Sequence, residues 1–430
     1  MRKNSPWRKC FVGTNTTIET ACGIQKRIFF NNGATPLILK KVSQTANQLF
    51  PCFTYLNEHN CNSEFITEQY NAVREKAAEF VHADTKKDVV LFTRTATEGL
   101  NLVAYLYQQL VPDGIIFSTC LEHMANYLSF QQRMNTKLIP LMPNGEIDLS
   151  QYAYMLETYK GQVKLVTVTG ASNLTGYVPP YYEMARMAHE YGAHIMVDAV
   201  QTVQHMPFSM LSYEDPCHID FTAFTAHKCY TGLAGAAIIG PKEFFDAKVY
   251  PLTFGAGVNA FANMSQVILA DTPDRYECGY PDITGITCFG TAMDFLMDCG
   301  MDGIEEYEYE LRQYLLEGLL DINGVIVYGP ISGKRAIPYV AFGMEGINYK
   351  ELAQKLGYQY GIAVSAGVAG ADIYTQWLLG LTDEQTYQLY QKGETYGTVR
   401  VSLGMFNSKI EVDRLLYALY EIGKNECCRH

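Results

Sequence analysis

The chain has 430 residues, 48% of them hydrophobic, and a formal net charge of −12 at pH 7. This length exceeds one typical domain, so we expect two. The acidic balance argues against nucleic acids and membrane surfaces as partners, because both attract basic faces. No apolar run approaches the roughly 18 residues of a membrane span, and residues 1–16 lack the apolar core of a secretory signal, so we expect a cytoplasmic protein. The twelve cysteines form no zinc-like C-x2-C pair, so we expect reduced thiols and no bound metal.

Short apolar segments alternate with amphipathic ones through the first two thirds of the chain. We predict strands at residues 89–92, 114–118, 163–168, 194–197, 221–224 and 236–239, and helices at 68–81, 97–110, 181–191 and 290–297. Strands and helices that alternate in this way predict an α/β fold with a mostly parallel sheet between helices.

The pattern changes after about residue 300. We predict helices at 303–320, 349–356 and 409–422, and strands at 324–328, 339–342, 361–364 and 398–403. This order predicts a smaller α/β domain. We therefore divide the chain into an N-terminal segment (1–28), which we expect to pack on the smaller domain, a large domain (29–299) and a small C-terminal domain (300–430).

Two of the predicted strands end in polar side chains. The segment 220–228 brings Thr225, His227 and Lys228 to its end, and the segment 194–201 brings Asp198. Ligands bind at the carboxyl ends of strands in such sheets. Pyridoxal phosphate (PLP) requires a lysine that forms the Schiff base and a carboxylate that partners the pyridinium nitrogen. Because most lysines after a strand are only solvated strand ends, the prediction depends on the neighbouring motifs.

Three further segments follow predicted strands. In the segment 90–101 we expect Thr97 to cap a helix whose open amides bind a phosphate, although an ordinary cap is equally typical. His123 is suited to lie on an aromatic ring, although a histidine alone is more typical of a core or a cap. Asn173 is suited to bond a phenolate oxygen or to make a turn. His189 and His194 resemble a zinc-binding helix, but the second histidine stands one position too late.

These segments occur in a fixed order: phosphate loop, His123, Asn173, the Asp-x-x-Gln of Asp198 and Gln201, and the Thr-x-His-Lys that ends at Lys228. In this order the chain resembles fold-type I PLP enzymes of the class V aminotransferase group. It is most similar to group II cysteine desulfurases and selenocysteine lyases, over residues from about 28 to 414. The resemblance is specific for the cofactor and much less specific for the reaction.

The resemblance implies roles around the cofactor ring. Lys228 is the Schiff-base lysine, Asp198 holds the proton of the pyridinium nitrogen, and His123 stacks on the ring. Gln201 and Asn173 bond the phenolic oxygen.

The resemblance also implies a phosphate site and a substrate site. Ala96, Thr97, Thr225 and His227 hold the phosphate. Arg400 grips the substrate carboxylate, a role that suits the forked guanidinium group.

The chain departs from this family pattern at four positions. Gly370 stands where desulfurases of this group carry their nucleophilic cysteine, and Ser365 replaces an arginine of the same loop. Asn31, which we expect to bind the substrate, stands where an aspartate is usual in the early active-site loop. Tyr280 replaces a threonine that reaches the phosphate of the other subunit in the homodimer that the resemblance implies, and we expect its hydroxyl to bind the phosphate in the same way.

We therefore expect a PLP-dependent, class V aminotransferase-like enzyme that acts at the α-carbon of a small amino acid. Transamination, β-elimination and epimerisation all stay open, because PLP supports each of them. One alternative is a cysteine desulfurase or a cysteine/cystine C–S lyase. Only a thiolate can take sulfur from the substrate as a persulfide, and Gly370 at the usual position of the cysteine argues against this step. A second alternative is a PLP-binding protein without turnover. Against it, such a protein has no need of Lys228, Asp198, His123 and Arg400 together.

Overall fold

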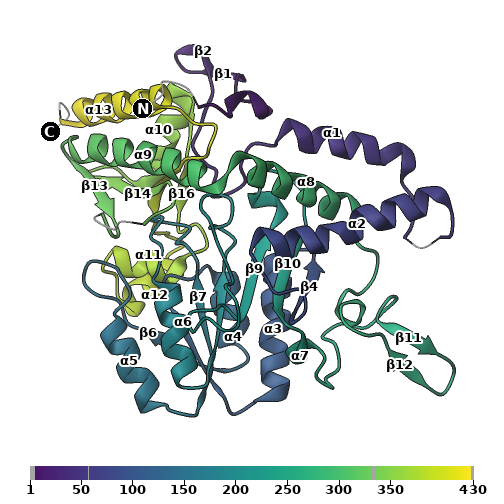
Figure 1. Ribbon diagram of the computed structural model, residues 1–430. Helices are drawn as coiled ribbons and strands as arrows, with labels where there is room; N and C mark the ends of the chain where they lie inside the picture. The colour runs from purple at the N-terminus through teal and green to yellow at the C-terminus, as the bar shows by residue number, and fades with distance from the viewer. Residues whose placement is uncertain (1–4, 57, 332–334, 428–430) are drawn as a thin grey trace.

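A computed structural model describes residues 5–56, 58–331 and 335–427, without the side chains of 425–427. A seven-stranded sheet lies in the lower part of Figure 1, and a four-stranded sheet with its helices lies above it. Among the described residues, no helix is both long enough and apolar enough to cross a membrane.

The seven-stranded sheet has the order β4-β10-β9-β8-β7-β5-β6, and only β10 is antiparallel to its neighbours. The mostly parallel sheet that the sequence predicts is therefore confirmed. Six of the strands fall on predicted segments: β4 (Asp88–Thr93), β5 (Ile115–Thr119), β7 (Val163–Thr169), β8 (His194–Asp198), β9 (Phe221–Thr225) and β10 (Ala236–Pro241). The edge strand β6 (Asn135–Ile139) was not predicted, because its Asn-Thr-Lys start has no apolar run.

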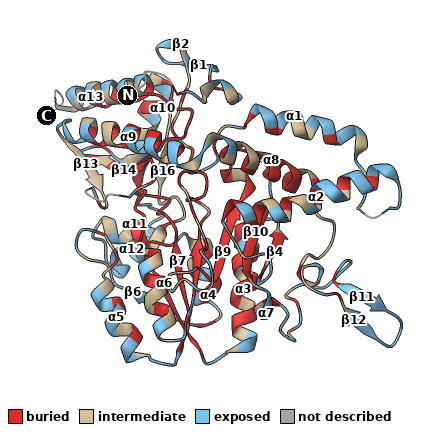
Figure 2. Cartoon of the chain, in the orientation of Figure 1, coloured by how far each residue is buried: buried red, intermediate tan, exposed pale blue. Residues whose placement is uncertain are grey.

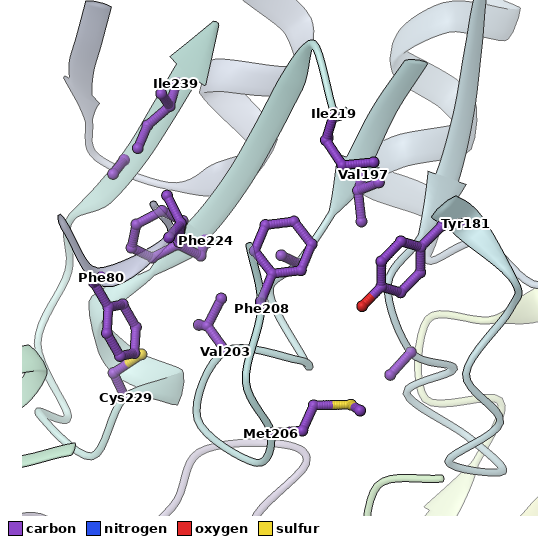
Figure 3. Close-up of a cluster of buried hydrophobic side chains, with 14 of the residues drawn as sticks. Phe80, Tyr181, Val197, Val203, Met206, Phe208, Ile219, Phe224, Cys229 and Ile239 are labelled. Carbon is purple, nitrogen blue, oxygen red and sulfur yellow. The ribbon is translucent and has the colours of Figure 1, made fainter. Parts of the chain in front are cut away.

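Helices cover both faces of this sheet, so its strands are buried on both sides (Figure 2). On β9, Phe221 packs in the cluster beneath α3 (Ala96–Leu110), whereas Phe224 packs in the opposite cluster. Figure 3 shows the second cluster, where Phe80 and Cys229 lie near Phe224. Successive strand residues thus point to opposite cores, as a pleated strand requires. The other helices here are α2 (Cys61–Phe80), α4 (Met124–Gln131), α5 (Leu149–Thr158), α6 (Tyr181–Glu190), α7 (Lys242–Phe245) and α8 (Ile283–Cys299).

The four-stranded sheet has the order β13-β14-β17-β16 and is antiparallel throughout. It consists of β13 (Val325–Tyr328), β14 (Tyr339–Met344), β16 (Ser365–Gly367) and β17 (Thr398–Ser402), and it packs with α9 (Met301–Leu320), α10 (Tyr349–Tyr360) and α13 (Lys409–Cys427). Gly300, with φ +77°, joins α8 to α9. The loop after β16 leads to α11 (Asp372–Leu378) and α12 (Asp383–Gln391), which lie beside the larger sheet in Figure 1.

The described N-terminal residues contact the four-stranded part of the molecule. The strand β3 (Ile28–Phe29) pairs in parallel with β15 (Ile362–Ala363), and Arg8 Nη1 lies 2.9 Å from Glu411 Oε1. The hairpin β1 (Thr17–Thr20) and β2 (Gly23–Lys26) lies above them in Figure 1, and α1 (Lys40–Leu49) runs along α8. Phe11 of the same segment packs against Tyr230 and Phe295 of the larger part, so the three-part division of the chain stays a proposal.

A second hairpin extends away from the body of the molecule (Figure 1). It consists of β11 (Asn259–Ala262) and β12 (Val267–Leu269), and most of its residues are exposed (Figure 2). Phe261, Met264, Val267 and Ile268 are among its exposed large apolar side chains.

Candidate active site

A cavity of about 340 Å³ lies at the carboxyl ends of β7, β8 and β9. Its wall includes Thr169, Asp198 and Thr225, the last residues of these three strands. Ten of the residues that we predicted for the site line it: Ala96, Thr97, His123, Asn173, Asp198, Gln201, Thr225, His227, Lys228 and Arg400. Segments that lie far apart in the sequence thus meet at one end of the sheet, as parallel strands predict.

Asp198 and Lys228 enter the cavity from neighbouring strands. Asp198 ends β8, and Lys228 lies in the single turn (Ala226–Lys228) that follows β9. Burial raises the pKa of Asp198 to about 6, although the nearby Lys228 opposes the shift. Burial, together with the charge of Arg400, lowers the pKa of Lys228 to about 7. The lysine therefore has a substantial neutral fraction near neutral pH.

The amine of Lys228 also holds the early loop at residues 31–35. Its Nζ atom donates to Gly33 O at 2.5 Å and to Ala34 O at 2.6 Å. A Cβ atom on Gly33 would lie 2.9 Å from Arg400 Cζ and from Tyr339 Cε2, so a larger residue would displace one of these side chains. The glycine lets the loop approach both the lysine and the arginine.

Arg400, on β17, closes the cavity from the smaller sheet. It is 2% exposed, and burial lowers its pKa. Nη1 donates to Asn173 O at 2.7 Å, Nη2 donates to Asn31 Oδ1 at 3.3 Å, and Nε is buried without a hydrogen-bond partner. Asn31 is thus a partner of Arg400 and does not line the cavity. Arg400 thus has one buried N–H group without a partner among the described residues.

The helix cap at the start of α3 differs from the prediction. Thr95 is the N-cap, because its side chain accepts from Glu98 N at 3.1 Å, while Glu98 Oε2 accepts from Arg94 N at 2.8 Å. Thr97 is therefore the second residue of the helix, and our assignment of it as the cap was wrong. The Thr-x-x-Glu spacing of residues 95–98 is the signal that we missed. Ala96 and Thr97 still line the cavity, beside the amide groups of the first turn.

Thr225 and His227 form a hydrogen-bonded pair beside this helix end. The Thr225 hydroxyl donates to Gly235 O at 3.0 Å and lies 2.9 Å from His227 Nδ1. Because the hydroxyl proton is directed to the carbonyl, His227 Nδ1 donates to Thr225. Burial and the charge of Lys228 lower the pKa of His227 to about 4, so the ring is neutral near neutral pH.

His123 lies under the loop that follows β16. It caps α4, and its Nδ1 accepts from Ala125 N at 3.1 Å. A Cβ atom on Gly370, whose φ is +75°, would lie 2.4 Å from His123 Nε2. Met124 N donates to Gly370 O at 2.8 Å, and Asn173 Nδ2 donates to Ala369 O at 2.7 Å. The loop is therefore held against the cavity with no space for a side chain at position 370.

A chain of buried hydrogen bonds behind the cavity was not predicted from the sequence. Glu308 Oε2 lies 2.7 Å from His205 Nδ1, and His205 Nε2 lies 2.9 Å from the Tyr339 hydroxyl. Tyr339 donates to Gln201 Oε1 at 2.9 Å, and Gln201 Nε2 donates to Gly33 O at 3.0 Å. Because Tyr339 occupies the amide oxygen, the NH2 group of Gln201 faces the early loop and the cavity. This relay positions Gln201, and no local sequence signal reveals partners about a hundred residues apart.

A second group that was not predicted is Glu122, next to His123 in the sequence. It is fully buried and accepts from Thr119 Oγ1 at 2.6 Å, Asn126 Nδ2 at 2.6 Å and Thr169 N at 3.0 Å. Burial raises its pKa to about 8, although these hydrogen bonds oppose the shift. The carboxyl group ties the start of α4 to the ends of β5 and β7.

No described cysteine lines the cavity. Cys229 follows Lys228 but is fully buried in the core beside Phe80 (Figure 3), and burial raises the pKa of its thiol. Cys278 and Tyr280 line a separate groove, and Tyr280 is 51% exposed with its ring centroid 5.5 Å from that of Tyr55. Within this chain, Tyr280 thus does not join the other predicted site residues.

The architecture and the cavity define a fold-type I α/β enzyme, with a large mixed sheet between helices and a smaller α/β unit. The chain belongs to the aminotransferase class-V family, whose model matches residues 28–415. It is 32% identical over 360 residues to a probable cysteine desulfurase of Halalkalibacterium halodurans, with 82% of each chain covered. Its structure is similar to the apo structure of a cysteine desulfurase from Thermococcus onnurineus, with a TM-score of 0.82, 27% identity, and 93% and 95% of the two chains covered. A cysteine desulfurase from Escherichia coli matches with a TM-score of 0.77 and 25% identity over 92% and 94% of the two chains.

Proposed function

We propose that this enzyme binds PLP and acts at the α-carbon of a small amino acid. The observation that carries the proposal is the placement of Lys228 and Asp198 on adjacent strands in one cavity, with Arg400 on its wall. An amine, a buried carboxylate and a guanidinium group suit the cofactor aldehyde, the ring nitrogen and a substrate carboxylate, respectively.

The residues of the cavity fit the cofactor. Lys228 has a depressed pKa and Arg400 has an unused buried donor. The amides of the first turn of α3 would hold the phosphate, whose charge favours that end of a helix. Thr225 and His227 would join them once their protons turn from Gly235 O and Thr225 Oγ1 to the phosphate. His123 would stack on the ring, and Gln201 and Asn173 would bond its phenolic oxygen. When bound, PLP supplies an electron sink that stabilises negative charge at the substrate α-carbon.

The side chains of this chain would then carry out binding and proton transfer. Arg400 binds the substrate carboxylate and so orients the α-carbon. Asp198 keeps a proton on the ring nitrogen. Lys228, which has a neutral fraction near pH 7, takes the α-proton onto Nζ as a general base. The hydrogen bonds around Gln201 and His123 fix the side chains that face the ring.

The first experiment tests the cofactor. The purified protein should be yellow, and borohydride should bleach its visible band and fix the cofactor on Lys228, as peptide mapping would show. Lys228→Ala should lose the covalent link, whereas the exposed Lys242→Ala should keep it. A colourless protein that takes up no added PLP would refute the proposal.

The second question is the reaction, for which a C–S lyase or desulfurase activity is the other candidate. The relatives named cysteine desulfurases favour it, whereas Gly370 argues against a persulfide on the protein because it has no nucleophilic side chain. We therefore expect no protein persulfide after incubation with L-cysteine, while elimination could still release sulfide. Alkylation and mapping of all twelve cysteines would test this. A single-turnover persulfide on one site, such as Cys229 or Cys278, would make a desulfurase the better assignment.

Binding of PLP without turnover is the remaining candidate. A panel of amino acids, followed by absorbance and mass spectrometry, distinguishes it from catalysis. A spectral change with a product indicates an enzyme, whereas a static band indicates a binder.

We propose further that the enzyme is a homodimer, in which Tyr280 reaches the phosphate of the partner's cofactor. The support is the exposed position of Tyr280 outside its own cavity and the apolar side chains of the β11–β12 hairpin, which project from the body of the molecule (Figure 1). Exposed apolar surface of this kind is typical of an interface. A monomer by light scattering that still turns over would contradict this proposal. A cytoplasmic location and the absence of nucleic-acid partners stay predictions.

A further inference from the structure

Three side chains cluster at the end of the large sheet that lies opposite the cavity. His189 lies in the last turn of α6, whereas His218 and Asp220 immediately precede β9. His189 Nε2 lies 2.9 Å from Asp220 Oδ2, and His218 Nε2 lies 3.3 Å from Asp220 Oδ1. The two imidazole rings are stacked, with centroids 4.1 Å apart and an interplanar angle of 21°.

The backbone fixes the tautomer of both histidines. His189 Nδ1 lies 2.9 Å from Pro216 O, and His218 Nδ1 lies 2.9 Å from Asp215 O. A carbonyl oxygen only accepts hydrogen bonds, so both Nδ1 atoms carry a proton. In a neutral ring, both Nε2 atoms then hold lone pairs, and both face the carboxylate of Asp220.

Two imidazole nitrogens and a carboxylate thus converge on one point, and their ligand atoms all lie within 4.8 Å of one another. A divalent cation at this point would be bound by both Nε2 lone pairs and by the carboxylate.

We propose that His189, His218 and Asp220 bind one divalent transition-metal ion, with Zn²⁺ as the best match. Two imidazoles and a carboxylate form a common zinc donor set, and the Nδ1–carbonyl bonds are the support that metal-binding histidines usually have. Tetrahedral zinc with bonds of about 2.0–2.1 Å separates its ligand atoms by about 3.3 Å. His189 Nε2 lies 2.9 Å from Asp220 Oδ2 and His218 Nε2 lies 3.3 Å from Asp220 Oδ1, and both separations are close to this value. Water completes the coordination, since the side chains of His189 and His218 are 19% and 15% exposed.

The position of the site assigns it a structural role. Asp220 Oδ2 also accepts from Ile195 N at 2.7 Å, so the cluster ties the start of β8 to the start of β9. The other ends of these two strands carry Asp198 and Lys228. A metal ion here would hold the two strands in register without taking part in the reaction.

The experiment measures zinc on the full-length protein. We expect one equivalent of Zn²⁺ per chain by mass spectrometry of the metal after chelation, reloading and desalting, with the thiols alkylated beforehand. His218→Gln and His189→Gln each remove one ligand and should weaken zinc binding by at least about 100-fold. His82→Asn, which replaces an exposed histidine with φ +52° by a residue that tolerates this conformation, is the matched control and should bind zinc normally.

Two further readouts distinguish this site from zinc bound to thiols or loosely to the surface. Co²⁺ should give the visible bands of a tetrahedral nitrogen–oxygen site without a thiolate charge-transfer band. Added Zn²⁺ should raise the Tm of the wild type and of His82→Asn, but not that of either glutamine variant. Two variants are used so that the test survives if one does not fold. Equal zinc content in the wild type and the folded variants, or zinc that disappears on alkylation, would mean an adventitious ion and would overturn the proposal.

Discussion

Replacement of Arg400 by alanine should raise the KM for amino-acid substrates by about 30- to 700-fold while PLP stays bound. The guanidinium group is 2% exposed, and its described internal bonds, to Asn173 O and Asn31 Oδ1, leave Nε without a partner. A substrate carboxylate in this position would accept charge-assisted hydrogen bonds away from water. Loss of such a pair costs about 2–4 kcal/mol, and 1.4 kcal/mol corresponds to about a tenfold change.

The assay compares steady-state kinetics of the wild type and Arg400→Ala on the amino acid that the panel identifies. PLP content, measured by absorbance, checks that the cofactor site is intact. Arg186→Ala, on the exposed face of α6, is the control and should leave KM unchanged. A substrate analogue without the carboxylate should react equally with both enzymes. Unchanged kinetics in Arg400→Ala would refute the carboxylate-binding role.

Three other changes test the surroundings of the cavity. Glu308→Gln should weaken PLP binding by about tenfold, because it disrupts the buried chain of hydrogen bonds that ends at Gln201. The control is Glu306→Gln on the exposed face of the same helix, which should leave the affinity unchanged. Equal affinities of the two variants would show that this chain does not position Gln201 for the cofactor. Gly370→Ala should lower the free energy of unfolding by about 1–3 kcal/mol more than Gly380→Ala does. Both glycines have positive φ, but only a Cβ atom at position 370 would meet the imidazole of His123. Equal denaturation midpoints of the two variants would contradict this reasoning. The rate at which PLP binds covalently to the apo protein, measured after borohydride fixation, should rise with pH through about 7 and then level off. The reason is that the amine of Lys228 becomes neutral above its lowered pKa. A rate that rises steadily towards about pH 10 would indicate a lysine with an ordinary pKa.

The sequence predicted the parts of the fold that have a strong local pattern. The apolar runs of β7, β8 and β9 are buried on both faces, so their composition alone identifies them. The strand β6 escaped prediction because it is an edge strand with three polar residues at its start. The cap of α3 was misplaced by two residues because Thr95 and Thr97 both stand at the start of the helix and threonine is a common cap residue. The hydrogen bond from Glu98 N to the Thr95 side chain distinguishes them.

The site residues divide in the same way, into those that have a local signal in the sequence and those that have none. Those that follow a strand, such as Asp198 and Lys228, were predictable because the ends of neighbouring parallel strands must meet. Glu308, His205 and Tyr339 were not, because their contacts join α9, the loop after β8 and β14, and depend on how the two sheets pack. The partner of His189 was missed for the same reason: it is His218, from a different segment, and not His194, which stands nearby in the sequence.

The early loop is fastened by the same nitrogen atom that the cofactor would use. Lys228 Nζ holds the carbonyl groups of Gly33 and Ala34, and this loop continues from β3, which pairs with β15. If Nζ bonded to the cofactor, its protons would no longer be available to both carbonyls. Binding of the cofactor would therefore release the loop from the lysine, and the empty and loaded proteins should differ in amide hydrogen exchange around residues 31–35. The conformation of this loop would then depend on a lysine that lies nearly two hundred residues away in the sequence.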